Sequence, residues 1–79
     1  MGNSQNHEQN QPSARQILAR NLKRLRAERN WSQEDLALES SLHRTFVAHV
    51  ERGMRNISVD NLEKLAVALK VPVYQLLVP

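Results

Sequence analysis

Residues 31–53, W-S-Q-E-D-L-A-L-E-S-S-L-H-R-T-F-V-A-H-V-E-R-G, contain two short helical patterns separated by a tight turn. The first pattern follows Ser32, a favourable N-cap residue, and Asp35 stands three residues later as in a capping box. A second pattern begins near His43 and ends before Gly53, which suits the left-handed residue that commonly follows a helix. This stretch therefore predicts two short, consecutive helices.

The spacing of these two helices is typical of a helix-turn-helix. Ala37 is small at the point where the helices would cross, and Leu42 supplies an aliphatic side chain after the turn. Val47 and Val50, one turn apart, would pack the second helix against the first. The remaining side chains of the second helix are short, polar or cationic, which suits base edges in a DNA major groove. The pattern favours DNA binding; an αα-hairpin in another small helical bundle is the alternative.

The flanking segments supply three further predicted helices. The first begins after Ser13, which forms a capping pair with Gln16, and is the most basic part of the chain. Another begins after Ser58 and carries an i, i+3, i+4, i+7 apolar stripe. A short fifth helix is expected over Val73–Leu77, where Leu76 would close the core. The apolar stripes of the two longer helices are Ile17, Leu18, Leu22 and Leu25, and Leu62, Leu65, Ala66 and Leu69.

Composition favours a single small domain. The chain has 79 residues, a formal net charge of +3 and a pI near 10.0. This length is near the lower limit for a self-sufficient core, and the modest basic excess is compatible with a polyanionic partner. Residues 1–12 are rich in Asn and Gln and are expected to form a disordered polar tail, which leaves residues 13–79 as the folded domain. No apolar run is long enough to span a membrane.

No motif in the sequence assembles a catalytic or metal site. The chain has no cysteine, so thiolate ligands are absent. His43 and His49 are six residues apart, which places them on different faces of one helix, and His7 lies in the polar tail. We therefore predict no enzymatic activity, no metal and no cofactor.

The two central helices and the segment after them resemble a known family. The run S-Q-E-D-L-A, followed by L-H-R-T-F-V-A-H-V-E-R-G-M-R-N-I-S-V-D-N-L-E-K-L-A-V-A-L, is similar to the phage-repressor/Cro-like, or Xre-like, DNA-binding domains. Within that family, the chain looks most like small regulators such as controller proteins of restriction–modification systems. The resemblance covers Ser13 to Val78 and implies an all-α, five-helix, lambda-repressor-like fold. Ser41 departs from the pattern, because the family's turn most often has glycine there.

The resemblance implies a sequence-specific transcriptional regulator that binds a pseudo-palindromic double-stranded DNA operator as a homodimer. A controller protein of a restriction–modification system is one such regulator. RNA polymerase is a further candidate partner, and a cytoplasmic location beside the nucleoid is expected. The alternative is an antitoxin-like or adaptor module that uses the same fold to bind another protein.

Residues that contact bases are expected on the second helix of the motif and in the loop after it. By the resemblance, Arg44 and Thr45 begin that helix and point at base edges, and Arg55 reaches bases from the loop. Ala48 and His49 lie one turn further along and can extend the contact. Phe46 stands where controller-like proteins often have tyrosine, and we expect it to pack between the two helices.

Other residues are expected to position the protein on DNA or to hold it together. Gln33, Arg52 and Asn56 are the predicted phosphate contacts, Gln33 because it lies at the positive end of a helix dipole. The resemblance implies a structural ion pair between Arg26 and Glu51. The C-terminal segment is too apolar to be entirely surface, which predicts a dimer interface there. Its residues are Val71, Val73, Tyr74, Leu77 and Val78.

Overall fold

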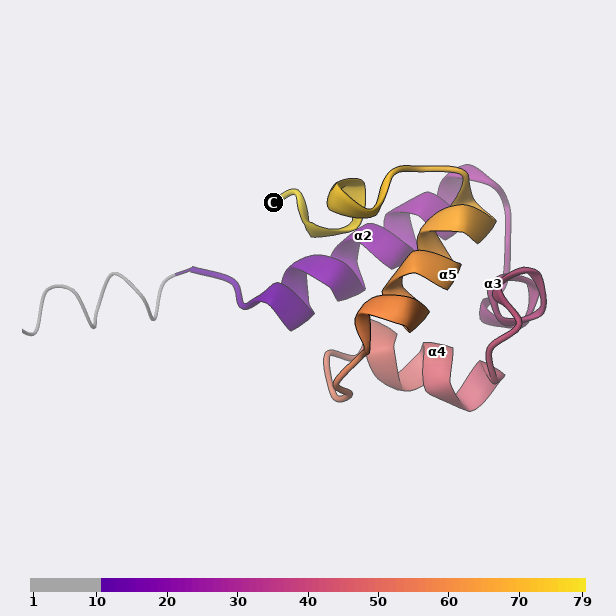
Figure 1. Cartoon of the computed structure of the whole chain (residues 1–79), viewed down its shortest axis with the longest axis horizontal. Helices are drawn as coiled ribbons and strands as arrows, with labels where there is room; N and C mark the ends of the chain where they lie inside the picture. The colour runs from indigo at the N-terminus through magenta and orange to yellow at the C-terminus, as the bar shows by residue number, and fades with distance from the viewer. Residues whose placement is uncertain (1–10) are drawn as a thin grey trace, which may run out of the picture.

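The computed structural model describes residues 11–79, and this part of the chain is helical throughout, with no strand. Most of the predicted polar tail, residues 1–10, lies outside the described residues. None of the helices in residues 11–79 combines the length and the apolar character needed to cross a bilayer. The elements are α2 (Ala14–Glu28), α3 (Gln33–Ser40), α4 (Arg44–Glu51), α5 (Val59–Leu69) and the 3₁₀ helix η1 (Val73–Leu77) (Figure 1).

The all-α prediction is confirmed, but the expected fifth α-helix is wrong. Residues Val73–Leu77 form a single 3₁₀ segment, in which the N–H of Gln75 donates to the carbonyl of Pro72 at 3.0 Å. A run this short cannot propagate the i→i−4 bonds of an α-helix, and 3₁₀ geometry is common in such pieces. The described chain therefore has four α-helices and one 3₁₀ helix.

Serine residues begin three of the four α-helices, as the sequence predicts. Ser13 accepts from the N–H of Gln16, and Ser32 accepts from the N–H of Asp35. In both places the side chain at the third helical position reaches back to the cap, completing a capping box. Ser58 caps α5 by accepting from the N–H of Asn61 at 3.0 Å. These caps occupy N–H groups that would otherwise lack an intrahelical partner.

A left-handed residue follows each of the four α-helices, beginning with Asn30 after α2 at φ 57°. Ser41 adopts φ 61°, where the related domains usually have glycine, and this conformation carries a strain of about 1 kcal/mol. Gly53 follows α4 with φ 70°, and the N–H groups of Gly53 and Met54 return to the carbonyls of Val50 and His49, closing a Schellman motif. Lys70, after α5, is also left-handed at φ 59°.

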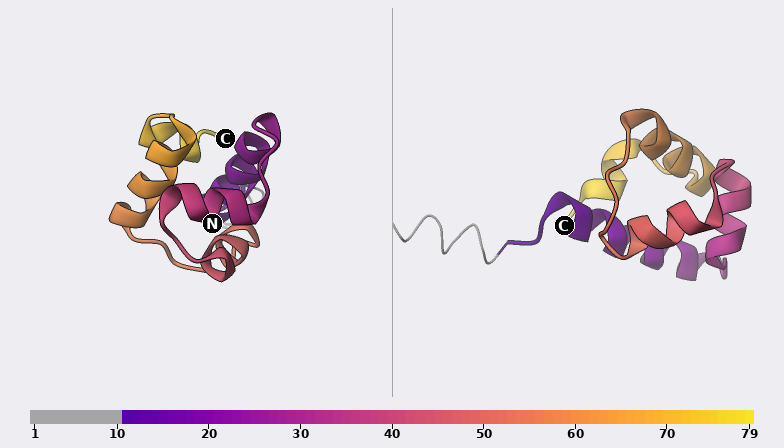
Figure 2. Two further views of the ribbon diagram at one scale, coloured as in Figure 1. Left: turned by 90° about the vertical axis from the view of Figure 1, so that its right-hand side faces the viewer. Right: turned by 90° about the horizontal axis from the view of Figure 1, so that it is seen from below.

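The core is aliphatic and draws on every element. Helix α2 packs against α4 and η1, while α3 packs against α4 and α5 (Figure 2). Leu76 of η1 is completely buried, which confirms its predicted place in the core. The seven side chains with essentially no exposed surface are Leu22, Leu36, Leu65, Leu69, Leu76, Val47 and Val50.

Two polar side chains, Asn21 in α2 and Arg29 just after it, attach the C-terminal half of the domain, and the sequence did not indicate either. Asn21 is buried, and its Nδ2 donates to the carbonyls of Leu76 at 2.8 Å and Val78 at 2.9 Å. Arg29 donates to the carbonyl of Leu25 at 2.9 Å and also to that of Leu69 at the end of α5. The C-terminal segment is thus held alongside the first half of α2 (Figure 1).

Candidate nucleic-acid interface

Helix α4 lies along one edge of the domain and presents one side away from the core (Figure 1). Val47 and Val50 are completely buried on its inner side. On its outer side, Arg44 and Thr45 are exposed in the first turn, and Ala48 and His49 are partly exposed one turn later. The sequence-based assignment of an outward face to these four residues therefore agrees with their exposure.

The loop between α4 and α5 lies beside α4 at the same edge (Figure 2). Arg55 is exposed in this loop, and its guanidinium carbon lies 5.3 Å from the centre of the Phe46 ring. The Phe46 side chain is itself half-buried and packs against the core. Asn56, the next residue of the loop, accepts a hydrogen bond from the guanidinium of Arg15 on α2. The loop is therefore attached both to α4 and to α2.

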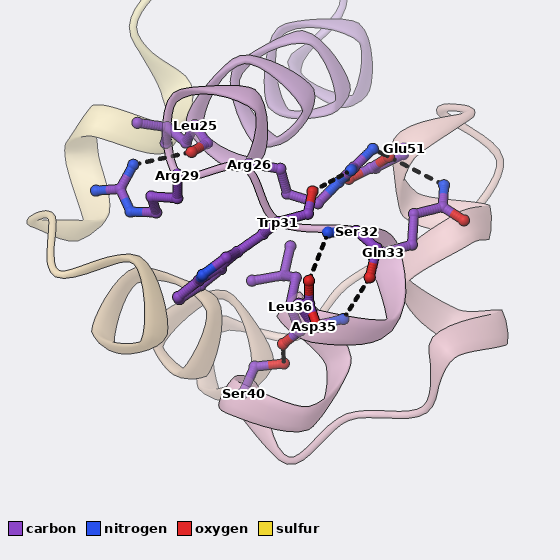
Figure 3. A network of polar contacts seen from close by, with 10 residues as sticks. All are labelled: Leu25, Arg26, Arg29, Trp31, Ser32, Gln33, Asp35, Leu36, Ser40 and Glu51. Carbon is purple, nitrogen blue, oxygen red and sulfur yellow. Dashed lines mark hydrogen bonds and ion pairs between the residues drawn. The ribbon is translucent and has the colours of Figure 1, made fainter.

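The ion pair between Arg26 and Glu51 is present and nearly buried (Figure 3). Arg26 Nε lies 2.6 Å from Glu51 Oε2 and Arg26 Nη2 lies 2.8 Å from Oε1, a bidentate arrangement. Only 19% of the Arg26 side chain and 2% of the Glu51 side chain are exposed. The hydrogen bond to Glu51, together with the charge of that carboxylate, raises the pKa of Arg26 above its ordinary value, although burial acts in the opposite direction.

This pair belongs to a network that fixes α4 against two other helices. Arg26 also donates to the carbonyl of Trp31 at 2.8 Å, in the segment between α2 and α3. Gln33, at the start of α3, donates from Nε2 to Glu51 Oε1 at 3.0 Å (Figure 3). The carboxylate at the end of α4 therefore receives hydrogen bonds from α2 and α3, and the direction of α4 is set by both.

The predicted phosphate contacts have different surroundings. The Gln33 amide donates one of its two N–H bonds to Glu51, so the other N–H and the N–H groups at the start of α3 are the donors for a phosphate here. Arg52 is exposed just beyond α4. It lines a cleft of about 560 Å³ together with Arg20 and Lys23 of α2, which brings three cationic side chains to one place.

The predicted dimer patch divides into a buried and an exposed part. Val71 and Val73 are half-buried and pack against the core. Tyr74, Leu77 and Val78 are exposed by 67%, 40% and 45%. Leu77 borders a groove of about 260 Å³ whose lining combines the apolar residues Ala14, Leu18, Ile57 and Leu62 with the polar residues Arg15, Arg55 and Asn56.

The histidines of the described chain do not form a metal site. No group of three or more His, Asp and Glu side chains within residues 11–79 is arranged to hold an ion. His43 caps α4 without a side-chain hydrogen bond, and His49 lies in the last turn of that helix. Both histidines therefore lie beside the outer face of α4, and His43 also lines a recess there with Thr45 and Phe46.

Comparisons with known proteins give relatives along most of the domain. A protein of Neisseria meningitidis described as a hypothetical transcription factor is 49% identical over 65 residues, which are 82% of this chain and 61% of that protein. The chain therefore spans less than two thirds of that relative's length. The control protein C.SmaI of Serratia marcescens is 46% identical over 63 residues, covering 80% of this chain and 75% of that protein.

The fold is likewise similar to solved structures. The crystal structure of a hypothetical transcription factor, NHTF, from Neisseria superposes with a TM-score of 0.83 and 48% identity, covering 85% of this chain and 77% of that chain. The restriction–modification controller protein C.Esp1396I, solved as a tetramer on its natural 35 base-pair operator, gives a TM-score of 0.75 and 30% identity over 85% of this chain and 92% of that chain.

The sequence motifs predicted a resemblance to Xre-like regulators and controller proteins, and these relatives confirm it. A family model described as helix-turn-helix matches residues 22–76, a span that begins within α2 and ends within η1. The match includes the whole α3–turn–α4 unit and more than half of the chain, so this protein belongs to the helix-turn-helix family.

Proposed function

We propose that this protein is a sequence-specific regulator of transcription that binds double-stranded DNA as a homodimer. The observation that carries the proposal is the outer face of α4, where Arg44 and Thr45 are exposed while the opposite face is fixed by the Arg26–Glu51 pair. A short helix held rigidly with its N-terminal turn outward is the arrangement that enters a DNA major groove.

In this proposal the first turn of α4 and the adjacent loop recognise bases. Arg44 donates to O6 and N7 of a guanine, a bidentate contact that discriminates against other bases by about 1–3 kcal/mol. Thr45 either donates a hydrogen bond or packs its methyl group on a thymine. Ala48 adds an apolar contact, and His49 adds a polar one at the far end of the helix. Arg55 reaches a further base edge from the loop.

The contacts that position the protein on the duplex are polar or cationic and surround this face. They come from the N–H groups and side chain at Gln33, from Arg52 and from Asn56. Arg20 and Lys23 share a cleft with Arg52 and so reinforce the positive potential there. Phosphate contacts of this kind set orientation and affinity but carry no sequence information.

Dimerisation follows from the size of the recognition surface. One short helix spans about half a site, and two-fold pairing doubles the contact with a pseudo-palindromic operator. We place the interface at the exposed C-terminal side chains Tyr74, Leu77 and Val78, with Val71 and Val73 beneath them. The apolar part of the groove beside Leu77, formed by Ala14, Leu18, Ile57 and Leu62, gives a second copy a surface to fill. The similarity to C.Esp1396I, which is a tetramer on its operator, supports assembly on DNA.

A more specific role as a controller of a restriction–modification system is suggested by the similarity to C.SmaI. Such a protein acts in the cytoplasm, on chromosomal or plasmid DNA. If it activates transcription, RNA polymerase is a further partner. Binding-site selection from random DNA gives the operator, and its half-sites should be related by a two-fold axis.

The division between recognition and positioning is tested by two arginine variants. Arg44→Ala should lower affinity for the selected operator by about ten- to one-hundred-fold and remove the preference at one base pair per half-site. Arg52→Ala should weaken binding to all sequences alike and lower the slope of log K against log salt by about one unit per protomer. Competition binding with single-substituted operators, at several salt concentrations, measures both effects.

Two outcomes would contradict the assignment. If both variants lost the same base preference, Arg52 would be a recognition residue as well. If the wild-type chain selected no common sequence from random DNA, the proposed function itself would be wrong.

A further inference from the structure

We propose that Phe46 is a positioning residue for Arg55. The ring of Phe46 holds the Arg55 guanidinium where it can reach a base edge. This inference rests on the proposed function and concerns a residue that the sequence placed only between helices. Phe46 belongs to α4 and Arg55 to the following loop, so the contact joins two parts of the recognition surface.

The ring is suited to act as a fixed platform. Phe46 follows Thr45 on α4, and its half-buried side chain packs against the core. A ring held in this way has little freedom of its own. The Arg55 guanidinium carbon lies 5.3 Å from the ring centre, within the range over which a cation is attracted to an aromatic face.

The backbone on either side of Arg55 is also held. On one side, the N–H of Met54 donates to the carbonyl of His49 at 3.0 Å, which closes the end of α4. On the other side, Asn56 accepts from Arg15 of α2. With the loop held at both flanks, the largest remaining freedom is in the long Arg55 side chain. The contact with Phe46 removes part of that freedom before DNA is bound.

Stacking leaves the hydrogen-bonding edge of Arg55 available. A guanidinium is planar, and its N–H groups point outward in that plane. A guanidinium that lies with the face of this plane on a ring keeps its edge free, and a guanine O6/N7 pair is recognised by that edge. The same side chain can therefore rest on Phe46 and donate to a base at once.

The surroundings of the contact connect it with the start of α4. Phe46 and Arg55 line one recess of about 370 Å³, together with His43, Thr45 and Asn61. Thr45 is a proposed base contact, so both recognition elements open onto the same hollow. Arg55 is thus placed beside the base pairs that the first turn of α4 would meet.

The expected effect of the ring is modest and specific. A cation–π contact at an exposed site contributes about 0.5–1 kcal/mol, which corresponds to about two- to five-fold in binding. Without the ring, the long Arg55 side chain would become ordered only on binding, and this costs a similar amount of binding free energy. Without the ring, affinity for the preferred operator should fall by about two- to tenfold, and the loss should be confined to the base pair that Arg55 contacts.

The test compares Phe46→Leu with Phe46→Tyr in the full chain. Phe46→Leu keeps an apolar side chain against the core and removes the ring; it should lower affinity for the selected operator and flatten the preference at the Arg55 base pair. Phe46→Tyr keeps the ring and should retain that preference, even if its hydroxyl strengthens binding to all sequences through a phosphate. Phe46→Met repeats the first substitution if Phe46→Leu lowers the melting temperature.

A double-mutant cycle with Arg55→Ala separates positioning from packing. In the Arg55→Ala background, Phe46→Leu should have no further effect on base preference. The inference is overturned if Phe46→Leu weakens all sequences alike, or if its effect persists without Arg55. The inference is also wrong if wild type selects an operator but Arg55→Ala keeps every base preference. That outcome would leave the proposal of a DNA-binding regulator standing. A wild type that selects no sequence overturns both.

Discussion

Glu51 is an ionisable side chain placed almost entirely out of water, on the same short helix that carries the proposed base contacts. Removing a carboxylate from water is strongly unfavourable unless its charge and its oxygens find partners. Here Arg26 neutralises the charge through two hydrogen bonds, and Gln33 supplies a third. The pKa of Arg26 is raised from an already high value, so the guanidinium stays charged over ordinary pH, and the stability that this raised pKa contributes is lost as the pH rises through the folded-state value.

Arg26→Ala should therefore destabilise the domain. Breaking a buried pair by removing one partner typically costs about 3–5 kcal/mol, and we expect the lower part of that range because Gln33 still donates to Glu51. Arg24→Ala is the matched control, because Arg24 lies on the same helix and pairs with Glu28 at 3.0 Å while both side chains are half exposed. Its free energy of unfolding should change by less than about 1 kcal/mol.

Urea unfolding of the two variants measures the difference. Equal losses of stability would mean that burial of Glu51 does not determine the strength of its pair. If Arg26→Ala were as stable as wild type but failed to bind DNA, Arg26 would be a DNA contact instead of a structural residue.

At the scale of elements, η1 shows how a segment too short to be stable alone is held by another helix. Five residues in 3₁₀ geometry gain few hydrogen bonds of their own, and helix formation in so short a run is unfavourable. Asn21 of α2 compensates by donating to the carbonyls of both Leu76 and Val78. Its two hydrogen bonds, with the buried Leu76, attach η1 to the domain.

Asn21→Ala should release this attachment. Two carbonyls lose their donor, which should cost about 1–3 kcal/mol and lower the melting temperature. The amide of Gln75 should also exchange with solvent faster, since its hydrogen bond lies inside η1. Asn61→Ala is the control, because Asn61 is bonded to Ser58 through its backbone N–H and keeps that bond. Unchanged exchange at Gln75 in Asn21→Ala would show that Leu76 alone holds η1.

At the scale of the whole molecule, several exposed apolar side chains lie close together at one end of the chain. Tyr74, Leu77 and Val78 gather at the C-terminal segment, beside a partly apolar groove that α2 and the α4–α5 loop help to form. Pairing of two copies through this surface would be isologous, with the same residues contributed by each. The two α4 helices should then meet successive major grooves, about 34 Å apart along the duplex.

Leu77→Glu should convert a dimer into a folded monomer, because a carboxylate would be buried in each half of the interface. Val67→Glu is the control, since Val67 is 70% exposed on α5 and lies away from η1. Sedimentation equilibrium gives the mass of each variant, and circular dichroism gives its helix content. A wild type that stays monomeric at tens of micromolar would refute a stable dimer. A monomeric Val67→Glu, with a dimeric wild type, would place the interface elsewhere.

Local signals in the sequence were sufficient for the four α-helices and for the serine caps of three of them, but not for the 3₁₀ geometry of η1. Ser32 with Asp35, and Ser13 with Gln16, predicted capping boxes that the structure contains, because a cap depends on residues only three positions apart. Gly53 predicted the left-handed end of α4 for the same reason. The buried position of Leu76 followed from the apolar character of the C-terminal segment. The outward face of α4 followed from helical periodicity.

Apart from the Arg26–Glu51 pair, which the resemblance implied, contacts between distant residues were decided by the tertiary structure alone. Asn21 lies 55 and 57 residues from its two carbonyl partners, and Arg29 lies 40 residues from Leu69. The ring of Phe46 meets Arg55 only because the loop after α4 turns back beside the helix. Sequence periodicity identifies which face of a helix is buried, but a side-chain partner depends on how helices cross. That geometry is set by packing of the whole core, which no local pattern encodes.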